Sequence, residues 1–234
     1  MIGEDIIITT ESLLRLLLWL SPSFPVGAFS YSHGLEAAVE AGLVRDLASV
    51  TDWVRTVLHH GAGRSDAVLF VQAHRHAFDE EALDRVTELA DAFRPTAELA
   101  LEAGAQGQAF LTAIAAAWPD PWWTLWRQRL RTSGRSPAYP VAVAVATARA
   151  GIAAEPALAA FLHAFSANLV SAAVRLVPLG QSDGLRALAA LEMDVLLAAQ
   201  AALGRTLDDL GGAVPMAEWC SMTHETQYTR LFRS

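Results

Sequence analysis

The residues that could bind a metal ion are the seven histidines, and their spacing decides whether they can share one. His59 and His60 are adjacent, and His74 and His76 are two apart in a predicted helix. Side chains two apart on a helix point about 200° away from one another, so neither pair can hold one ion without distortion. The chain has no HExxH and no CxxC motif. We therefore predict no metal site and no bound cofactor.

The chain offers few side chains for nucleophilic catalysis. The segment GAFSYSHG (27–34) is not a G-x-S-x-G motif, and it follows a predicted helix where that motif follows a strand. Cys220 stands four residues before His224, a spacing that allows a pair on one helical turn, but we do not predict a catalytic thiol. All 17 basic residues are arginines. The absence of lysine excludes a Schiff base and a Walker A phosphate site.

The loop over residues 21–36, SPSFPVGAFSYSHGLE, separates two predicted helices and is too apolar for an ordinary solvated turn. Pro25 fixes φ and removes an amide donor, while Gly27 allows backbone angles that other residues avoid. We expect Pro25 and Gly27 to set the shape of the loop. We also expect Phe29 and Tyr31 to be buried, either by the fold or by a complex.

Composition limits the class of protein. The 234-residue chain is 53% hydrophobic and 18% charged, which is too apolar for disorder and long enough for a substantial core. Its formal net charge of −8 argues against a nucleic-acid partner and against an anionic membrane surface. The single cysteine excludes an intrachain disulfide and fits a reducing compartment. Because the N-terminus is acidic where a signal peptide would be basic, we expect a cytoplasmic protein.

Apolar residues recur at helical spacing along most of the chain, and no convincing strand pattern occurs. We predict an all-α, single-domain bundle of roughly eight to ten helices over residues 11–212. Residues 1–10 are predicted as an N-terminal arm and residues 213–234 as a C-terminal partner-docking tail. The signals for helix ends include Ser32 as a cap, the Asp120-Pro121 pair and Gly204.

The helix predicted from Pro156 to about residue 177 is the best candidate for the central core helix. Its apolar residues alternate in steps of four and three. Its length also suggests a membrane span, but Arg175 alone would cost about 2.5–3.5 kcal/mol at mid-bilayer. A helix buried in protein is therefore the better interpretation.

Arg175 and the C-terminal tail have residue types suited to contacts rather than to catalysis. Arg175 could satisfy the last carbonyls of its helix or present a planar donor fork to a partner, and Gln181 follows closely. A terminal segment of this kind docks on its own domain or inserts into a partner groove, and the sequence leaves both open. The tail combines apolar with basic residues: Trp219, Met222, Tyr228, Leu231 and Phe232 with Arg230 and Arg233.

The chain resembles the urease accessory protein UreF family in four segments that extend nearly from end to end. These segments are LLLWLSPSFPVGAFSYSHGLEAAVEAGLV near the front, AYPVA around Tyr139, SAAVRLVPLGQSDG from Ser171 to Gly184, and SMTHETQYTRLFRS at the end. The first and the last are long and specific. The resemblance implies an all-α homodimer that acts as a non-enzymatic chaperone for nickel insertion. UreF-like proteins bind UreD, also called UreH, and that pair recruits the GTPase UreG to apo-urease.

The resemblance also implies site residues. On the side of UreG it matches Arg175, Gln181 and Tyr139. On the side of UreD/UreH it matches His224, Glu225, Tyr228, Arg230, Leu231, Phe232 and Arg233. A structural loop is matched by Pro25, Gly27, Phe29, Tyr31, Ser32, Gly34 and Glu36. The chain departs from the family pattern at Gln108, where arginine is frequent, and at residues 136–138, where a glycine–histidine type pair is common.

Two other functions stay open on the residues alone. A soluble α-helical enzyme could build a site from scattered residues such as His163, Glu98 and Arg175. A helical adaptor could serve an unrelated partner. His163 also has a structural interpretation, as a histidine in the core or at its edge.

Overall fold

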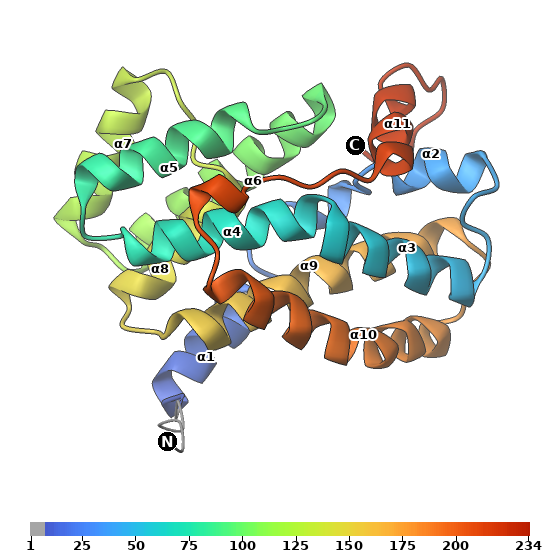
Figure 1. The fold of residues 1–234 in the computed structure, drawn as a ribbon, viewed down its shortest axis with the longest axis horizontal. Helices are drawn as coiled ribbons and strands as arrows, with labels where there is room; N and C mark the ends of the chain where they lie inside the picture. Colours follow the sequence, from blue (N-terminus) through green and yellow to red (C-terminus); the bar gives the residue numbers. More distant parts are fainter. Residues whose placement is uncertain (1–7) are drawn as a thin grey trace.

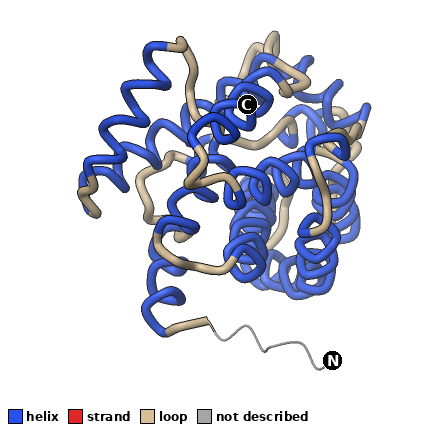
Figure 2. Tube along the Cα trace, turned by 60° about the vertical axis from the view of Figure 1, so that its left-hand side comes forward, coloured by secondary structure: helices blue, strands red, loops and turns tan. Residues whose placement is uncertain are grey.

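The computed structural model describes residues 8–234, and these residues form helices and loops without a strand (Figures 1 and 2). Eleven α-helices and two short 3-10 helices are present in this range. They are α1 (Thr10–Trp19), η1 (Ala28–Ser30), α2 (Leu35–Glu40), α3 (Leu47–His60), α4 (Ala62–Arg75), α5 (Glu80–Ala92), α6 (Ala97–Ala117), α7 (Pro121–Thr132), α8 (Tyr139–Arg149), α9 (Ala154–Leu176), α10 (Gln181–Leu203), η2 (Leu207–Asp209) and α11 (Pro215–His224).

The all-α prediction is confirmed, but the predicted number of helices is too low by one. The additional helix is α11, which lies in the segment that we predicted as a tail. Its N-terminal turn begins with Pro215, a residue well suited to the first helical position. Of the predicted N-terminal arm, residues 1–7 lie outside the described residues, and α1 begins at Thr10.

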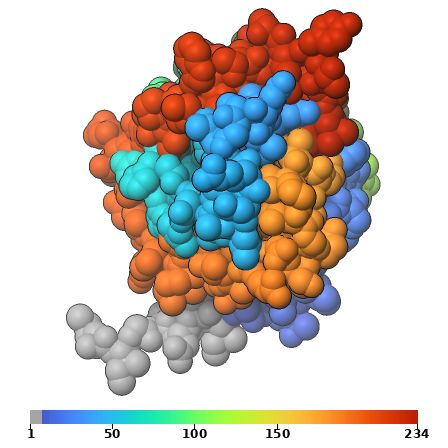
Figure 3. Space-filling view, turned by 90° about the vertical axis from the view of Figure 1, so that its right-hand side faces the viewer, coloured from blue at the N-terminus to red at the C-terminus, as the bar shows by residue number. Residues whose placement is uncertain are grey.

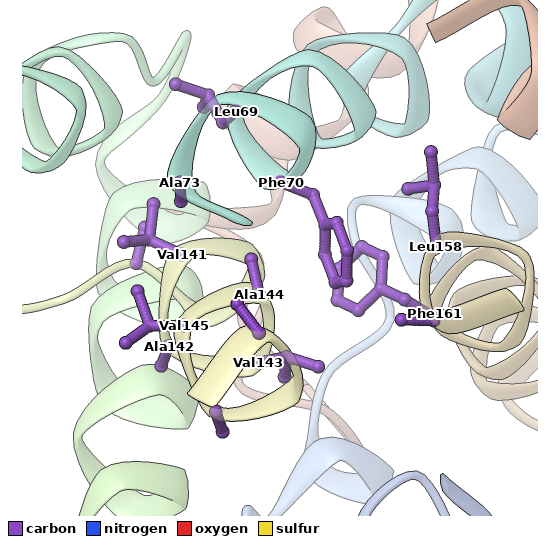
Figure 4. Packing of buried hydrophobic residues seen from close by; sticks show 14 of the residues in the cluster. Leu69, Phe70, Ala73, Val141, Ala142, Val143, Ala144, Val145, Leu158 and Phe161 are labelled. Carbon is purple, nitrogen blue, oxygen red and sulfur yellow. The ribbon is translucent and has the colours of Figure 1, made fainter. Parts of the chain in front are cut away.

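The core lies where α8 packs against α4, α6 and α9. Every residue of α8 from Pro140 to Ala148 is buried, because this helix is enclosed on all sides. Its alternating valines and alanines allow close approach of the neighbouring helices. Figure 4 shows Phe70 of α4 and Phe161 of α9 facing each other beside α8, with ring centroids 5.4 Å apart.

The predicted central helix is α9, which packs against α10, α4, α3 and α8. It begins at Ala154, two residues before Pro156, because proline is tolerated in the first turn of a helix. By length and composition, α9 could also cross a membrane, and half of its most apolar window is buried inside the bundle. Burial of this kind is typical of a core helix.

The local signals for helix ends have mixed outcomes. The Asp120 side chain accepts the Trp122 amide at 2.8 Å and Gly204 ends α10, both as predicted. Gly34 is the residue that precedes α2, but the Ser32 hydroxyl still accepts the Glu36 amide at 3.3 Å, so Ser32 binds the first turn of this helix from two residues further out. The Ser32 hydroxyl also donates to the main-chain oxygen of Ser234, 202 residues away. One side chain thus makes both the local contact that the pattern predicted and a long-range contact that it did not.

Candidate functional site

The C-terminal segment, residues 213–234, lies on the bundle beside α2, α6 and the end of α9. Figure 3 shows it in red above α2, which is blue, and beside the orange end of α9. The connection between α10 and α11, residues 204–214, passes over α4 and leads to this position (Figure 1); we call this connection the strap. Arg64 of α4 fixes the strap by donating to the Gly211 carbonyl at 2.6 Å.

His224, the last residue of α11, is the centre of a buried polar cluster. Its ring is fully enclosed by protein. Nδ1 lies 2.8 Å from Glu98 Oε2, and Nε2 lies 3.0 Å from Glu36 Oε2. Arg230 adds a cationic contact, with Nη1 3.1 Å from Glu98 Oε1. One side chain of the C-terminal segment therefore bridges α2 and α6.

Glu36 also binds the main chain of the residues that follow α11. From here on, "tail" means only these residues, 225–234, and "C-terminal segment" means residues 213–234. Its carboxylate accepts the Leu231 amide at 2.7 Å and the Phe232 amide at 2.9 Å. Because these bonds go to the backbone, they fix which residues of the tail lie against α2, whatever side chains those residues carry. A carboxylate that accepts several N–H groups in a buried site is a strong anchor.

The end of the tail is held by the loop at residues 21–36 and by α6. The Ser32 amide donates to the main-chain oxygen of Ser234 at 2.8 Å, and the Arg233 amide donates to the Ser30 carbonyl at 2.8 Å. The Ser234 hydroxyl donates to Glu102 Oε2 at 2.7 Å. The two segments that best carry the family resemblance are therefore in direct contact with each other.

The loop has the shape that its glycines require. Gly27 has φ +72° and Gly34 has φ +77°, both in the left-handed region. A Cβ on Gly34 would lie 2.8 Å from the Ser221 amide nitrogen, so only glycine lets α11 approach this closely. Tyr31 is 4% exposed, whereas Phe29 is 66% exposed. The fold therefore buries Tyr31, whereas Phe29 stays exposed and could be buried only by a complex.

Arg175 lies against the tail. Its guanidinium carbon is 4.3 Å from the centre of the Phe232 ring, and Nε donates to the Ser171 carbonyl at 3.3 Å. Desolvation lowers the pKa of the Arg175 guanidinium, but arginine keeps its charge at physiological pH. The side chain is exposed, so its remaining donors can reach a partner. The prediction that Arg175 satisfies its own helix and the prediction that it faces outward are both compatible with this geometry.

The exposed part of the C-terminal segment is strongly apolar. Tyr228 is completely exposed, and large parts of four other side chains face solvent: Met216, Trp219, Met222 and Leu231. Glu225 and Arg233 are exposed beside them. The segment thus holds to the bundle with His224 and Phe232 and presents a second, apolar face outward.

Comparisons with known proteins agree about the family. A family model described as UreF matches residues 44–192, more than half of the chain. A urease accessory protein UreF from Rhodopseudomonas palustris (strain BisB5) is 52% identical over 227 residues, which cover 96% of this chain and 92% of that protein.

Two relatives from other genera carry the same description. The protein from Granulibacter bethesdensis is 51% identical over 225 residues, with 95% and 94% of the two chains covered. The protein from Magnetococcus marinus is 46% identical over 232 residues, with 97% and 99% covered. The chain belongs to the UreF family. The resemblance seen in the four segments is thereby confirmed.

The UreF family's residues fall into two groups in this chain. Arg175, Gln181 and the tail lie at one end of the bundle, with Gln181 exposed as the first residue of α10. Tyr139 lies elsewhere, in the core between Phe110 and Phe161, with ring centroids 5.8 and 5.6 Å away. Burial raises the pKa of the Tyr139 hydroxyl. The structure does not bring Tyr139 to the surface that Arg175 occupies.

Sequence reasoning missed Glu102, and it gave Glu98 a place in the family pattern and in a hypothetical enzyme site but no partner. Both lie on α6, four residues apart, so they share one face of a helix that is otherwise rich in alanine. The spacing of the two acids on one face of an alanine-rich helix was available in the sequence, whereas their burial was not. The partner could not be found there, because His224 is 126 residues from Glu98.

The structure does not assemble the alternative enzyme sites. His163 is exposed on α9, while Glu98 is buried beneath His224. Cys220 is buried, and burial raises the pKa of its thiol, which disfavours the reactive thiolate. Over residues 8–234, no group of three or more His, Cys, Asp or Glu side chains has the arrangement of a metal site. The ring-to-carboxylate distances around His224 are those of hydrogen bonds.

Proposed function

We propose that this chain is a non-enzymatic factor for urease maturation, acting as a scaffold in the cytoplasm. Together with UreD/UreH it recruits the GTPase UreG to apo-urease, where nickel is inserted in a GTP-dependent step. Membership of the UreF family and its relatives' description as urease accessory proteins support this role. The observation that carries the proposal is the C-terminal segment, which is anchored by buried polar contacts and presents an apolar face to solvent.

The exposed face of the C-terminal segment is the proposed contact with UreD/UreH. Tyr228 and Leu231 project from the tail, and Glu225, Arg230 and Arg233 provide charges at the rim. Aromatic residues and arginine are the types enriched at protein interfaces. His224 and Phe232 are buried, so in this proposal they hold the surface in place rather than touch the partner.

The end of α9 and the start of α10 form the proposed contact with UreG. Arg175 and Gln181 are exposed there, and Arg175 is backed by Phe232. An arginine whose position is fixed by stacking loses less rotamer freedom on binding. Tyr139 can affect this contact only by positioning α8. Any effect on GTP hydrolysis is exerted through UreG.

We propose that the helices of residues 10–234 form one domain. We also propose that the free protein is a homodimer. Seven large apolar side chains are exposed on α1 and α10: Leu13, Leu14, Leu17 and Leu18 of α1 with Met193, Leu196 and Leu197 of α10. A groove of about 810 Å³ connects the two helices, and its lining includes Leu13 and Leu17 of α1, Leu196 of α10 and Phe29 of the loop. A second copy of the chain would cover this surface.

Co-expression with the urease components tests the proposal. We expect nickel-dependent urease activation to require this chain and to fail when residues 220–234 are deleted. Full activation without the chain would overturn the maturation role. Full activation by the truncated chain would overturn only the role of the tail.

Arg175→Ala separates the two partner surfaces. We expect the variant to keep its complex with UreD/UreH and to recruit less UreG on gel filtration of the purified components. Undiminished co-elution of UreG would refute the assignment of Arg175. Exposed Arg131 on α7, which has no carboxylate partner among the described residues, provides the matched control Arg131→Ala.

A further inference from the structure

Arg175 is held by an aromatic ring and a main-chain carbonyl instead of a carboxylate. Its guanidinium carbon lies 4.3 Å from the centre of the Phe232 ring, and Nε donates to the Ser171 carbonyl at 3.3 Å. Among the described residues, Nη1 and Nη2 of Arg175 have no hydrogen bond and no carboxylate partner, and the side chain is exposed. The edge of the guanidinium that carries Nη1 and Nη2 is therefore open to a partner.

Two other arginines show how this differs from an ordinary ion pair. Arg230 Nη1 lies 3.1 Å from Glu98 Oε1, and Arg94 Nη1 lies 2.7 Å from Asp66 Oδ1. A carboxylate neutralises the charge of an arginine and occupies part of its donor fork, whereas the face of a ring does neither. Arg175 is therefore positioned while its charge stays uncompensated.

The Phe232 ring is itself fixed in place. The residue is 4% exposed and lies in an apolar cluster formed by α2 and the end of α9 together with neighbouring residues. Its amide donates to Glu36 Oε2 at 2.9 Å, which fixes the backbone of Phe232 as well. The cluster includes Leu35, Ala38, Ala172, Ala173 and Val177. The ring is therefore a rigid surface against which the Arg175 guanidinium lies.

We propose that Arg175 binds a carboxylate of UreG through its open edge, and that Phe232 is the residue that positions it. This inference rests on the proposed assignment of Arg175 to the contact with UreG. A guanidinium binds a carboxylate through two parallel hydrogen bonds, so its orientation decides the strength of the contact. A cation–π contact at an exposed site corresponds to about two- to fivefold in binding.

NMR of the chain alone tests the positioning without a partner. Protons above the face of an aromatic ring are shifted upfield by the ring current, so we expect upfield Hδ and Hε signals from Arg175. In Phe232→Leu these signals should move to the ordinary range, and the Arg175→Lys spectrum assigns them. The matched reference is exposed Arg131, whose Nε also donates to a carbonyl four residues earlier. Unchanged Arg175 signals in Phe232→Leu would overturn the positioning role.

The affinity for UreG, measured by calorimetry on the complex of this chain with UreD/UreH, tests the functional part. We expect Phe232→Leu to weaken binding of UreG about two- to fivefold. Arg175→Ala should weaken it further, and adding Phe232→Leu to Arg175→Ala should change nothing more, because the ring acts through the arginine. Losses that multiply in the double variant would overturn the role of Phe232 alone. No effect of Arg175→Ala would refute the assignment of Arg175 as well.

Fluorinated phenylalanine at position 232 keeps the inference testable if Phe232→Leu does not fold. Fluorine withdraws electrons from the ring face with little change of shape, so affinity for UreG should fall stepwise with the number of fluorine atoms. Equal affinity at all degrees of fluorination would contradict the proposal. Val50 lies in the same apolar cluster, and Val50→Ala is the matched control for lost stability. We expect its affinity for UreG to stay unchanged.

The carboxylate is tested by the charge and shape of residue 175. Arg175→Lys keeps the charge without the planar fork, and Arg175→Gln keeps a donor without the charge. We expect affinity for UreG to decrease in the order Arg, Lys, Gln. Added salt should weaken the wild type more steeply than Arg175→Gln, because a contact between two exposed charges is screened. Equal salt dependence of the two proteins would overturn the carboxylate assignment.

Discussion

The two ends of the described chain both lie on the outside of the bundle, but they are held in different ways. α1 is anchored by Leu16 and Trp19, and the Trp19 ring meets Phe110 and Trp118 edge to face at 6.4 and 5.4 Å. The C-terminal segment also has buried apolar residues, Cys220 and Phe232, but it is anchored in addition by a histidine, by carboxylates and by main-chain hydrogen bonds. Both ends leave apolar side chains exposed, and each exposed surface is proposed to meet a partner.

The comparison shows what each kind of anchor specifies. Apolar contacts are non-directional, so Leu16 and Trp19 hold α1 to the core without requiring one residue partner. A carboxylate that accepts specified amides allows a single alignment, because a shift by one residue would leave buried donors without acceptors. The apolar contacts of α1 mainly stabilise its attachment to the core, and the polar contacts of the C-terminal segment fix which of its residues lie against the bundle.

Trp19→Ala should have the largest effect, by removing the apolar anchor of α1. Loss of a buried tryptophan costs about 3–5 kcal/mol of unfolding free energy, since a cavity remains among its neighbours. Urea denaturation monitored by circular dichroism measures this. A loss below about 1 kcal/mol would show that α1 contributes little to the core.

Glu36→Ala should destabilise the C-terminal segment by about 3 kcal/mol, since the His224 ring and the Leu231 and Phe232 amides all lose their acceptor. Trypsin should then cleave after Arg230 while the bundle keeps its unfolding midpoint. Exposed Glu40, at the other end of α2, provides the control Glu40→Ala. A variant that unfolds as a whole would show that the segment is part of the core.

Gly34→Ala tests how closely α11 approaches the loop. The new methyl group would lie 2.8 Å from the Ser221 nitrogen, on a residue with φ +77°. We expect a loss of about 1–3 kcal/mol in segment docking, measured by the same digestion. Gly42→Ala is the matched control, since Gly42 has φ +71° and nothing within 4 Å of a Cβ. Equal effects of the two changes would assign the loss to backbone strain alone.

Leu17→Ser should have the smallest effect on folding, within about 0.5 kcal/mol, because Leu17 is 61% exposed. Its effect should appear in association instead. Light scattering after gel filtration should show a shift from dimer to monomer. A dimer that withstands Leu17→Ser together with Leu196→Ser would move the proposed interface away from α1 and α10.

The sequence by itself determined the features that neighbouring residues control. Helical periodicity predicted the all-α class, and Asp120 with Pro121 predicted the start of α7. The glycine at position 27 indicated a backbone conformation that other residues avoid, and Gly27 is in the left-handed region. These features depend on φ/ψ preferences and on side chains within about one helical turn. The specific segments at the two ends also determined the family.

The tertiary structure alone decided which distant groups meet. Glu36 and His224 are 188 residues apart, and nothing in either neighbourhood indicates the other. The tertiary structure also decided that Tyr31 is buried while Phe29 is exposed, and that Ser32 binds Ser234 in addition to the first turn of α2. The physical reason is that burial and long-range hydrogen bonds depend on how helices pack, and local sequence leaves many packings open.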